Sequence, residues 1–156
     1  MTTLSDRPAA ERPRSVLVLG GGPAAFRLVR ALTERAEEPL SITVLAEEPY
    51  TPYDRVALEQ LFDDPERDLT LGDGSLWSRP EVHLLTETRA VALDRERRVV
   101  TDQRGEEHPY DDVVLATGSR AAVIPIPGSD HTHVFRGVDD VRGMVDEVAE
   151  LTARLG

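Results

Sequence analysis

The sequence predicts an α/β fold built on a parallel sheet, with an antiparallel β-hairpin inserted into it. Three observations lead to this prediction. A short apolar run and a β-branched run flank a segment of helical periodicity within the first 45 residues. A later pair of alternating segments surrounds a short polar turn, and another apolar run ends in small residues. Apolar runs of this length are typical of strands that are buried on both faces of a parallel sheet.

The first three elements form a βαβ unit. Residues 15–20 (SVLVLG) are the first predicted strand, which ends in glycine. The helix predicted over 24–35 keeps its apolar residues at helical spacing, and residues 41–45 (SITVL) form a second, β-branched strand. Strand, glycine turn, helix and strand thus follow one another within about 30 residues, which is the length of such a unit.

Weaker patterns predict the remaining elements. A Pro-rich loop follows the second strand, and the prolines of VIPIPGSD (123–130) exclude a helix there. Strand alternation and helical spacing predict a short helix over 56–62, a strand over 82–85, a hairpin from 89–94 and 98–102, a buried strand over 111–119 and an amphipathic helix over 138–155.

Composition and charge exclude several classes of protein. The formal net charge of -11 disfavours nucleic acid and anionic membrane surfaces as partners. The chain has no Cys, so a disulfide scaffold and a thiolate metal site are excluded, and we find no other candidate metal site. The N-terminus has no apolar signal core, so we expect a cytoplasmic protein without a membrane segment. Residues 1–13 are predicted to be a flexible tail that precedes one domain, 14–156.

The glycine turn after the first strand has the pattern G-x-G-x-x-A. Gly20 permits the tight turn, Gly22 lets a pyrophosphate approach the backbone, and Ala25 allows helix and strand to pack closely. The amides at the helix start would then meet the phosphates. Glu47 follows Ala25 by 22 residues, near the spacing of an acid that binds a ribose diol and disfavours NADP. NAD and FAD both remain open, as does a plain turn that binds nothing.

Two later motifs carry a family resemblance. EEPYTPYDRVALEQLF (47–62) and YDDVVLATGSRAAVIPIPG (110–128) resemble the flavin-binding domain of the FAD-dependent pyridine nucleotide oxidoreductases. Within that family, YDRVALEQLF is most similar to the flavoprotein region of NAD(P)H-dependent nitrite reductase large subunits. The resemblance implies a Rossmann-like FAD/NAD(P)-binding fold, FAD as the cofactor with NAD as the alternative, and membership of an NAD(P)H-dependent oxidoreductase.

The resemblance also implies a set of cofactor-binding residues. The pyrophosphate is expected to contact Gly20, Gly22, Pro23 and Ala25, and the adenosine ribose is expected to contact Glu47. The phosphates would lie near Arg55, and the adenine would lie near the backbone of Ala90. At the end of the last strand, the cofactor would pass close to Ala116, Thr117 and Gly118. A solvated Arg55 and an ordinary strand residue at Ala90 are the simpler readings of those two positions. No residue of this chain is predicted to be a catalytic acid or base.

Length bears on the expected activity. In the family, a nicotinamide-binding domain follows the last helix, and a later stretch completes the flavin site. We therefore expect residues 14–156 to be the first segment of an incomplete FAD-binding domain, which meets NAD(P)H only through a further domain or a partner chain. Self-association through an uncovered edge is a further expectation. The alternatives are a stand-alone NAD-binding or nucleotide-sensing module without catalysis, and an inactive truncated fragment.

Overall fold

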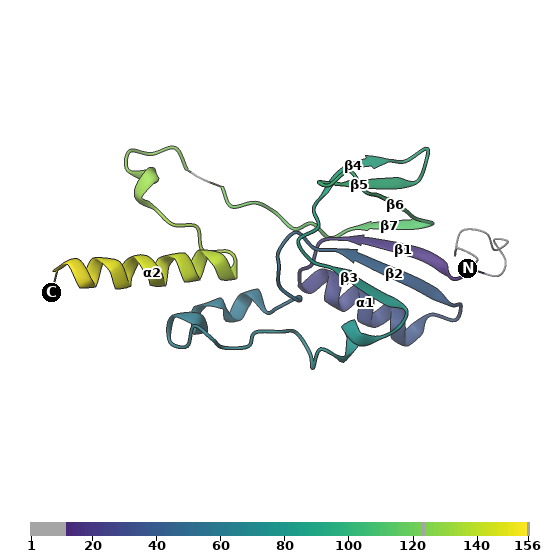
Figure 1. Cartoon of the computed structure of the whole chain (residues 1–156), viewed down its shortest axis with the longest axis horizontal. Helices are drawn as coiled ribbons and strands as arrows, with labels where there is room; N and C mark the ends of the chain where they lie inside the picture. Colours follow the sequence, from purple (N-terminus) through teal and green to yellow (C-terminus); the bar gives the residue numbers. More distant parts are fainter. Residues whose placement is uncertain (1–11, 123, 156) are drawn as a thin grey trace. The chain divides into compact units, whose positions relative to one another are not determined.

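The computed structural model of the chain describes residues 12–122 and 124–155, which form two compact units (Figure 1). The first unit comprises the chain up to Pro52 together with Leu71–Gly118, and the second comprises Tyr53–Thr70 and the chain from Ser119 onward. Most of the predicted tail, residues 1–11, lies outside the described residues.

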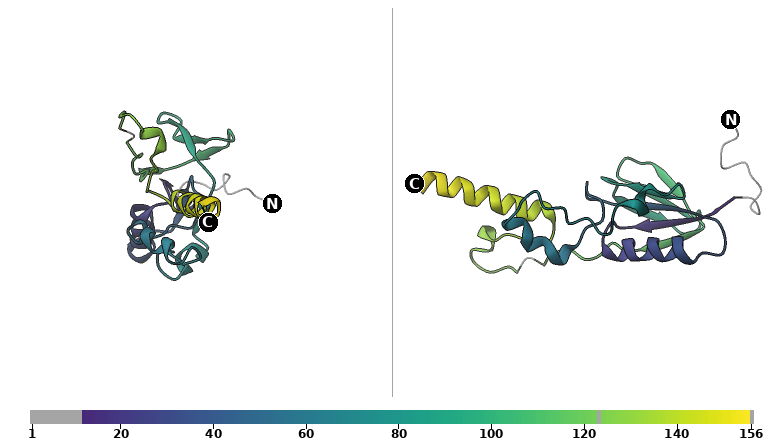
Figure 2. Two further views of the ribbon diagram at one scale, coloured as in Figure 1. Left: turned by 90° about the vertical axis from the view of Figure 1, so that its left-hand side faces the viewer. Right: turned by 90° about the horizontal axis from the view of Figure 1, so that it is seen from below.

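The first unit contains a four-stranded sheet in the order β3-β2-β1-β7, in which every pair is parallel. Its strands are β1 (Arg14–Leu19), β2 (Leu40–Leu45), β3 (Val82–Leu85) and β7 (Asp112–Leu115). Helix α1 (Pro23–Arg35) connects β1 to β2 and lies along one face of the sheet (Figure 2). The α/β prediction is therefore confirmed, and the carboxyl ends of all four strands meet at one edge.

Alternation along β1 explains why its last four residues, 16–19, are all apolar. Val16 and Val18 pack into a core with Phe26 and Val29 of α1, whereas Leu17 and Leu19 point to the opposite face and pack against Val100. Successive strand residues face opposite sides, so a strand that is covered on both sides has no position for a polar residue.

Strand β7 differs from the prediction of a buried strand. It pairs with β1 alone among the described strands, and its residues are half-buried, with Leu115 64% exposed. An apolar run specifies a strand with apolar surroundings, but it does not report whether both neighbouring strands are present.

The inserted antiparallel element is larger than a hairpin. Strands β4 (Ala90–Asp94) and β5 (Val99–Asp102) form the predicted hairpin, and β6 (Glu107–Pro109) adds a third strand. The third strand has only three residues and ends in proline, so it has too little alternation to be detected in the sequence. The 3-10 helix η3 (Ser75–Ser78), also in this unit, was not predicted either.

The second unit contains the long helix α2 (Val138–Leu155), η2 (Arg55–Phe62) and η4 (Ser129–His131). The α2 prediction agrees in both bounds, and the predicted short helix is the 3-10 helix η2. The carboxylate of Asp140 accepts hydrogen bonds from the amides of Arg136 and Gly137, which fixes the start of α2. No helix among the described residues is long and apolar enough to cross a membrane.

Two arginine–aspartate pairs join the amino ends of β1 and β7. Arg12 donates to both oxygens of Asp111 at 2.8 and 2.7 Å, and Arg14 pairs with Asp112. The Arg12 guanidinium and the Ser15 amide lower the pKa of Asp111. A pKa that is lower in the folded chain contributes stability above the unfolded value of about 3.9, and this contribution disappears as the pH falls below that value.

We therefore expect Asp111→Asn to make the acid-induced loss of stability shallower. The free energy of unfolding is measured by urea titration, monitored by Trp77 fluorescence, between about pH 5 and pH 2.5, because the contribution of Asp111 is lost in that interval. Arg12→Gln should flatten the same interval, because it removes the other half of the pair. A profile that stays as steep as the parent's in both variants would contradict the prediction.

Candidate functional site

The candidate site lies at the carboxyl edge of the parallel sheet in the first unit. Strand β1 lies between β2 and β7, and the chain leaves it toward β2 through α1, while β7 arrives later on its other side. The direction of the strand order therefore reverses between β1 and β7, and the carboxyl ends of these two strands form a topological switch point. Open α/β sheets bind their ligands in the crevice at such a point.

Close backbone packing explains the first two glycines. Gly20 has a φ of +118°, and a Cβ there would overlap the Ala116 carbonyl oxygen and lie 2.6 Å from its carbonyl carbon. A Cβ on Gly21 would lie 2.5 Å from the Cβ of Ala46, just after β2. Both glycines thus let the β1 end approach its neighbours. The G-x-G-x-x-A pattern assigns no role to Gly21, although the small residue Ala46 after β2 is a usable signal for close packing there.

Gly22 differs from its two neighbours. A Cβ built on it would have no atom within 4 Å, and its φ of -93° suits any residue, so neither packing nor backbone strain requires glycine there. It is the N-cap of α1, and no side chain caps this helix end. Bare, uncrowded backbone in front of a helix start is what a pyrophosphate requires.

The start of α1 is electrostatically suited to an anion. Pro23 occupies the first helical position and has no N–H, and the amides of Gly22, Ala24 and Ala25 have no partner within the helix. The first turn carries no acidic side chain, so nothing in it offsets the positive end of the helix dipole. The side chain of Ala25 is fully buried in the core beside β1, in the helix–strand packing expected of it.

The end of β7 lies against the same turn. The Ala116 amide donates to the Leu19 carbonyl at 2.8 Å, which extends the β1–β7 pairing by one residue. Thr117 and Gly118 then leave the sheet exposed, with Gly118 at a φ of +68°. The structure thus brings Ala116 and Thr117 next to Gly20, as the proximity of a Gly20 Cβ to both residues demonstrates.

Glu47 comes two residues after the end of β2, and its side chain is 70% exposed. Its carboxylate lies 3.9 Å from the guanidinium of Arg89, the residue before β4. Strand β2 neighbours β1 and runs parallel to it, so Glu47 stands at the same sheet edge as the glycine turn. An exposed carboxylate at this edge can accept hydrogen bonds from a sugar diol.

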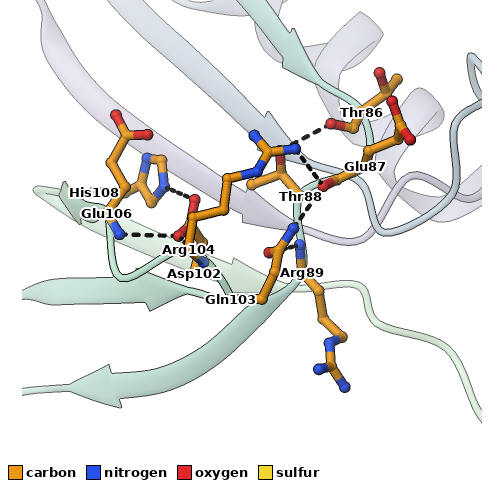
Figure 3. Close-up of polar contacts among 9 residues, drawn as sticks. All are labelled: Thr86, Glu87, Thr88, Arg89, Asp102, Gln103, Arg104, Glu106 and His108. Atoms are coloured by element: carbon orange, nitrogen blue, oxygen red, sulfur yellow. Dashed lines mark hydrogen bonds and ion pairs between the residues drawn. The ribbon is translucent and has the colours of Figure 1, made fainter.

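Side chains of the β5–β6 turn hold the segment that carries Arg89 (Figure 3). The side-chain oxygen of Gln103 accepts a hydrogen bond from the backbone amide of Arg89, and its side-chain nitrogen donates to the Glu87 carbonyl at 2.6 Å. The backbone amide of Gln103 donates to the Arg89 carbonyl at 2.9 Å. Arg104 donates to the same Glu87 carbonyl at 3.2 Å. Ala90 is half-buried, pairs with Asp102 in the strand ladder and packs against the Leu17 core, so only its backbone could serve a ligand.

Asp102, Glu106 and His108 are the one group of possible metal ligands that the described residues bring together, with ligand atoms within 4.8 Å of one another. The Asp102 carboxylate accepts from the amides of Arg104 and Glu106 and lies 3.2 Å from the His108 ring. Burial alone would raise the pKa of Asp102, but these hydrogen bonds outweigh it and lower that pKa. These hydrogen bonds close the β5–β6 turn, and the formation of that turn explains why the three side chains lie together.

Arg55 belongs to the second unit. Its guanidinium donates to the Arg136 carbonyl at 3.0 Å and lies 5.0 Å from the centre of the Tyr53 ring. Both contacts hold it against the start of α2 within its own unit.

Comparisons with known proteins agree with the fold. A family model described as pyridine nucleotide-disulphide oxidoreductase matches residues 14–154. The chain is 34% identical to the nitrite reductase [NAD(P)H] large subunit of Klebsiella oxytoca over 93% of its length, and 29% identical to nitrite reductase [NAD(P)H] of Bacillus subtilis over 85%. It covers 15% and 17% of those two proteins.

Solved structures give the same result. The crystal structure of NADH:rubredoxin oxidoreductase from Clostridium acetobutylicum matches 89% of this chain with a TM-score of 0.77 and 26% identity, and the chain covers 36% of it. A ferredoxin reductase from Rhodopseudomonas palustris has the same fold, with a TM-score of 0.76. The chain thus spans about a sixth of the curated nitrite reductases that it matches and about a third of these structures.

Proposed function

This chain belongs to the pyridine nucleotide-disulphide oxidoreductase family, and from that premise we propose that it forms the FAD-binding portion of an NAD(P)H-dependent flavoprotein oxidoreductase similar to the nitrite reductase large subunit. The observation that carries the proposal is the contrast within the glycine turn. Packing explains Gly20 and Gly21, whereas Gly22 faces open space in front of an uncapped helix start. A glycine that its own fold does not require is readily explained by a ligand that approaches the backbone.

The residues of the first unit would share the cofactor in the following way. The amides at Gly22, Ala24 and Ala25 would hold the pyrophosphate, and the Glu47 carboxylate would accept hydrogen bonds from the adenosine ribose. The backbone of Ala90 would meet the adenine. The small residues Ala116, Thr117 and Gly118 would leave room for the cofactor beside the strand end.

Arg55 would add a positive charge near the phosphates, a role that rests on the family resemblance alone. When bound, FAD would accept hydride from a nicotinamide and pass the electrons on to an acceptor, while the protein supplies position and electrostatics. NAD(P)H would be bound by a further domain or by a partner chain. The net charge of -11 argues against a role on nucleic acid or on anionic membranes.

Equilibrium titration of the purified chain with FAD, ADP and NAD tests the proposal. We expect all three to bind, because each carries the ADP half, and FAD to bind most tightly, with visible absorption in the chain freed of excess ligand. NAD binding tighter than FAD would instead identify a nicotinamide-binding module. No binding of any of the three would overturn the dinucleotide site itself.

Glu47→Gln should weaken FAD and ADP binding by about 10-fold or more, because a hydrogen bond to a charged group contributes roughly 1.5–3 kcal/mol. Glu48→Gln is the matched control, since it removes the same charge from the adjacent residue. We expect the control to bind like the parent. Equal losses in both variants would mean that general charge, rather than a diol contact at Glu47, governs binding.

A further inference from the structure

Glu47, the residue proposed to hold the adenosine ribose, belongs to a stretch of backbone that a second segment fixes. The amide of Thr88 donates to the Ala46 carbonyl at 2.8 Å, and the amide of Glu87 donates to the Glu48 carbonyl at 3.3 Å. The two acceptors are the residues immediately before and after Glu47. The direction in which the Glu47 side chain leaves the end of β2 therefore depends on where that second segment lies.

The second segment, residues 87–89, has no regular secondary structure to hold it. It connects β3 to β4, and Glu87 has a φ of +49°, which a residue with a side chain rarely adopts. A conformation of this kind persists where the surrounding contacts determine it. Figure 3 shows the side chains of Gln103 and Arg104 reaching from the β5–β6 turn toward this segment.

Gln103 joins the two ends of the segment. Its side-chain nitrogen donates to the Glu87 carbonyl, while its side-chain oxygen accepts from the Arg89 amide. The amide group of a glutamine offers a donor and an acceptor side by side, so one side chain satisfies both backbone groups at once. Arg104 adds a longer hydrogen bond, at 3.2 Å, to the same Glu87 carbonyl.

The turn that carries Gln103 is itself closed by internal hydrogen bonds. The carboxylate of Asp102, which is buried, accepts from the amides of Arg104 and Glu106 at 2.8 and 2.9 Å. The backbone amide of Gln103 also donates to the Arg89 carbonyl at 2.9 Å. Gln103 thus extends from a closed turn, and its side chain can hold the 87–89 segment in one place.

We propose that Gln103 is a positioning residue of the adenosine subsite. It holds residues 87–89, which in turn orient Glu47, so it raises the affinity for the nucleotide without touching it. This inference rests on the proposed function. The effect is specific to the adenosine half, because the pyrophosphate would meet the start of α1, whereas the side-chain hydrogen bonds of Gln103 go to the segment beside Glu47.

Gln103→Ala should weaken ADP binding by about 5-fold, because two side-chain hydrogen bonds are lost and part of that loss reaches Glu47. Binding of inorganic pyrophosphate should be unchanged. Calorimetric titration of the full chain with each of these two ligands measures both affinities, and urea unfolding of the same preparations verifies that they are folded. ADP affinity equal to that of the parent, or equal losses for ADP and pyrophosphate, would overturn the inference.

Leu93→Ala is the matched control. It is an uncharged truncation in the same three-stranded sheet, at a side chain that is 38% exposed, and it leaves the hydrogen bonds of Gln103 in place. We expect this variant to bind ADP like the parent. A control that loses as much ADP affinity as Gln103→Ala would attribute the effect to general weakening of the sheet and would overturn the positioning role.

A double-mutant cycle tests whether Gln103 acts through Glu47. In the Glu47→Gln background, Gln103→Ala should reduce ADP affinity by less than about 2-fold, because the contact that it supports is already lost. A full loss in both backgrounds would overturn the inference. A parent chain that binds no ADP would overturn the proposed function together with this inference, whereas a parent that binds ADP as tightly as Gln103→Ala overturns this inference alone.

Discussion

Gly20→Ala should lower the free energy of unfolding of the first unit by about 4 kcal/mol, a value that combines left-handed backbone strain with overpacking. The φ of +118° is unfavourable for any residue with a side chain, and the new methyl group would overlap the Ala116 carbonyl. That carbonyl belongs to backbone held by the β1–β7 pairing, so it cannot rotate away as a flexible side chain could. A loss of this size is a large fraction of the total stability of an ordinary domain.

Urea unfolding followed by the fluorescence of Trp77 measures this loss. Trp77 is the single tryptophan of the chain, and it packs against the core that α1 and the sheet share. Gly22→Ala is the matched control, because it adds the same methyl group two residues later with no atom within 4 Å. We expect this control to cost about 1 kcal/mol or less, because alanine is a poorer N-cap residue than glycine. A Gly20→Ala midpoint close to that of the control would contradict the packing argument.

The order and type of the main elements could be predicted because local signals and burial agree along most of the first unit. Strand β1 is covered on both faces, so its apolar run was unambiguous, and the helical spacing of α1 and α2 gave their type and their ends within one residue. Strand β6 and the exposed position of β7 could not be predicted. Both depend on which strands pair, and a single segment carries no information about its neighbours.

The sequence motifs indicated where the candidate site lies, but they could not identify its supporting contacts. The turn pattern pointed to Gly20, Gly22 and the edge where β1 and β7 meet, because the glycine spacing is tied to a local backbone geometry. It could not reveal that Gly21 packs on Ala46, or that Gln103 fixes the segment before β4. Those contacts join residues that are 14 to 25 positions apart, and they depend on the completed fold.

Gly22→Leu should reduce the affinity of the chain for FAD and ADP by at least about 100-fold, a loss of roughly 2.7 kcal/mol of binding free energy. The open space in front of Gly22 is where the pyrophosphate would meet the amides of the helix start, and a branched side chain would fill that space. Folding should lose only about 1 kcal/mol, because leucine is a poor N-cap residue, while the negative φ and the absence of a clashing neighbour add no further cost. Titration and urea unfolding of the same preparation separate the two effects.

The matched control is Gly143→Leu in α2. Gly143 also has no atom within 4 Å of a built Cβ and no positive φ, but it belongs to the second unit and lies away from the glycine turn in the sequence. Binding should be unchanged in this control, so a loss confined to Gly22→Leu would assign the dinucleotide to the β1–α1 turn. If Gly22→Leu binds FAD and ADP as tightly as the parent while remaining folded, the pyrophosphate does not contact this turn. The open space at Gly22 would then have no bearing on the chemistry of the protein.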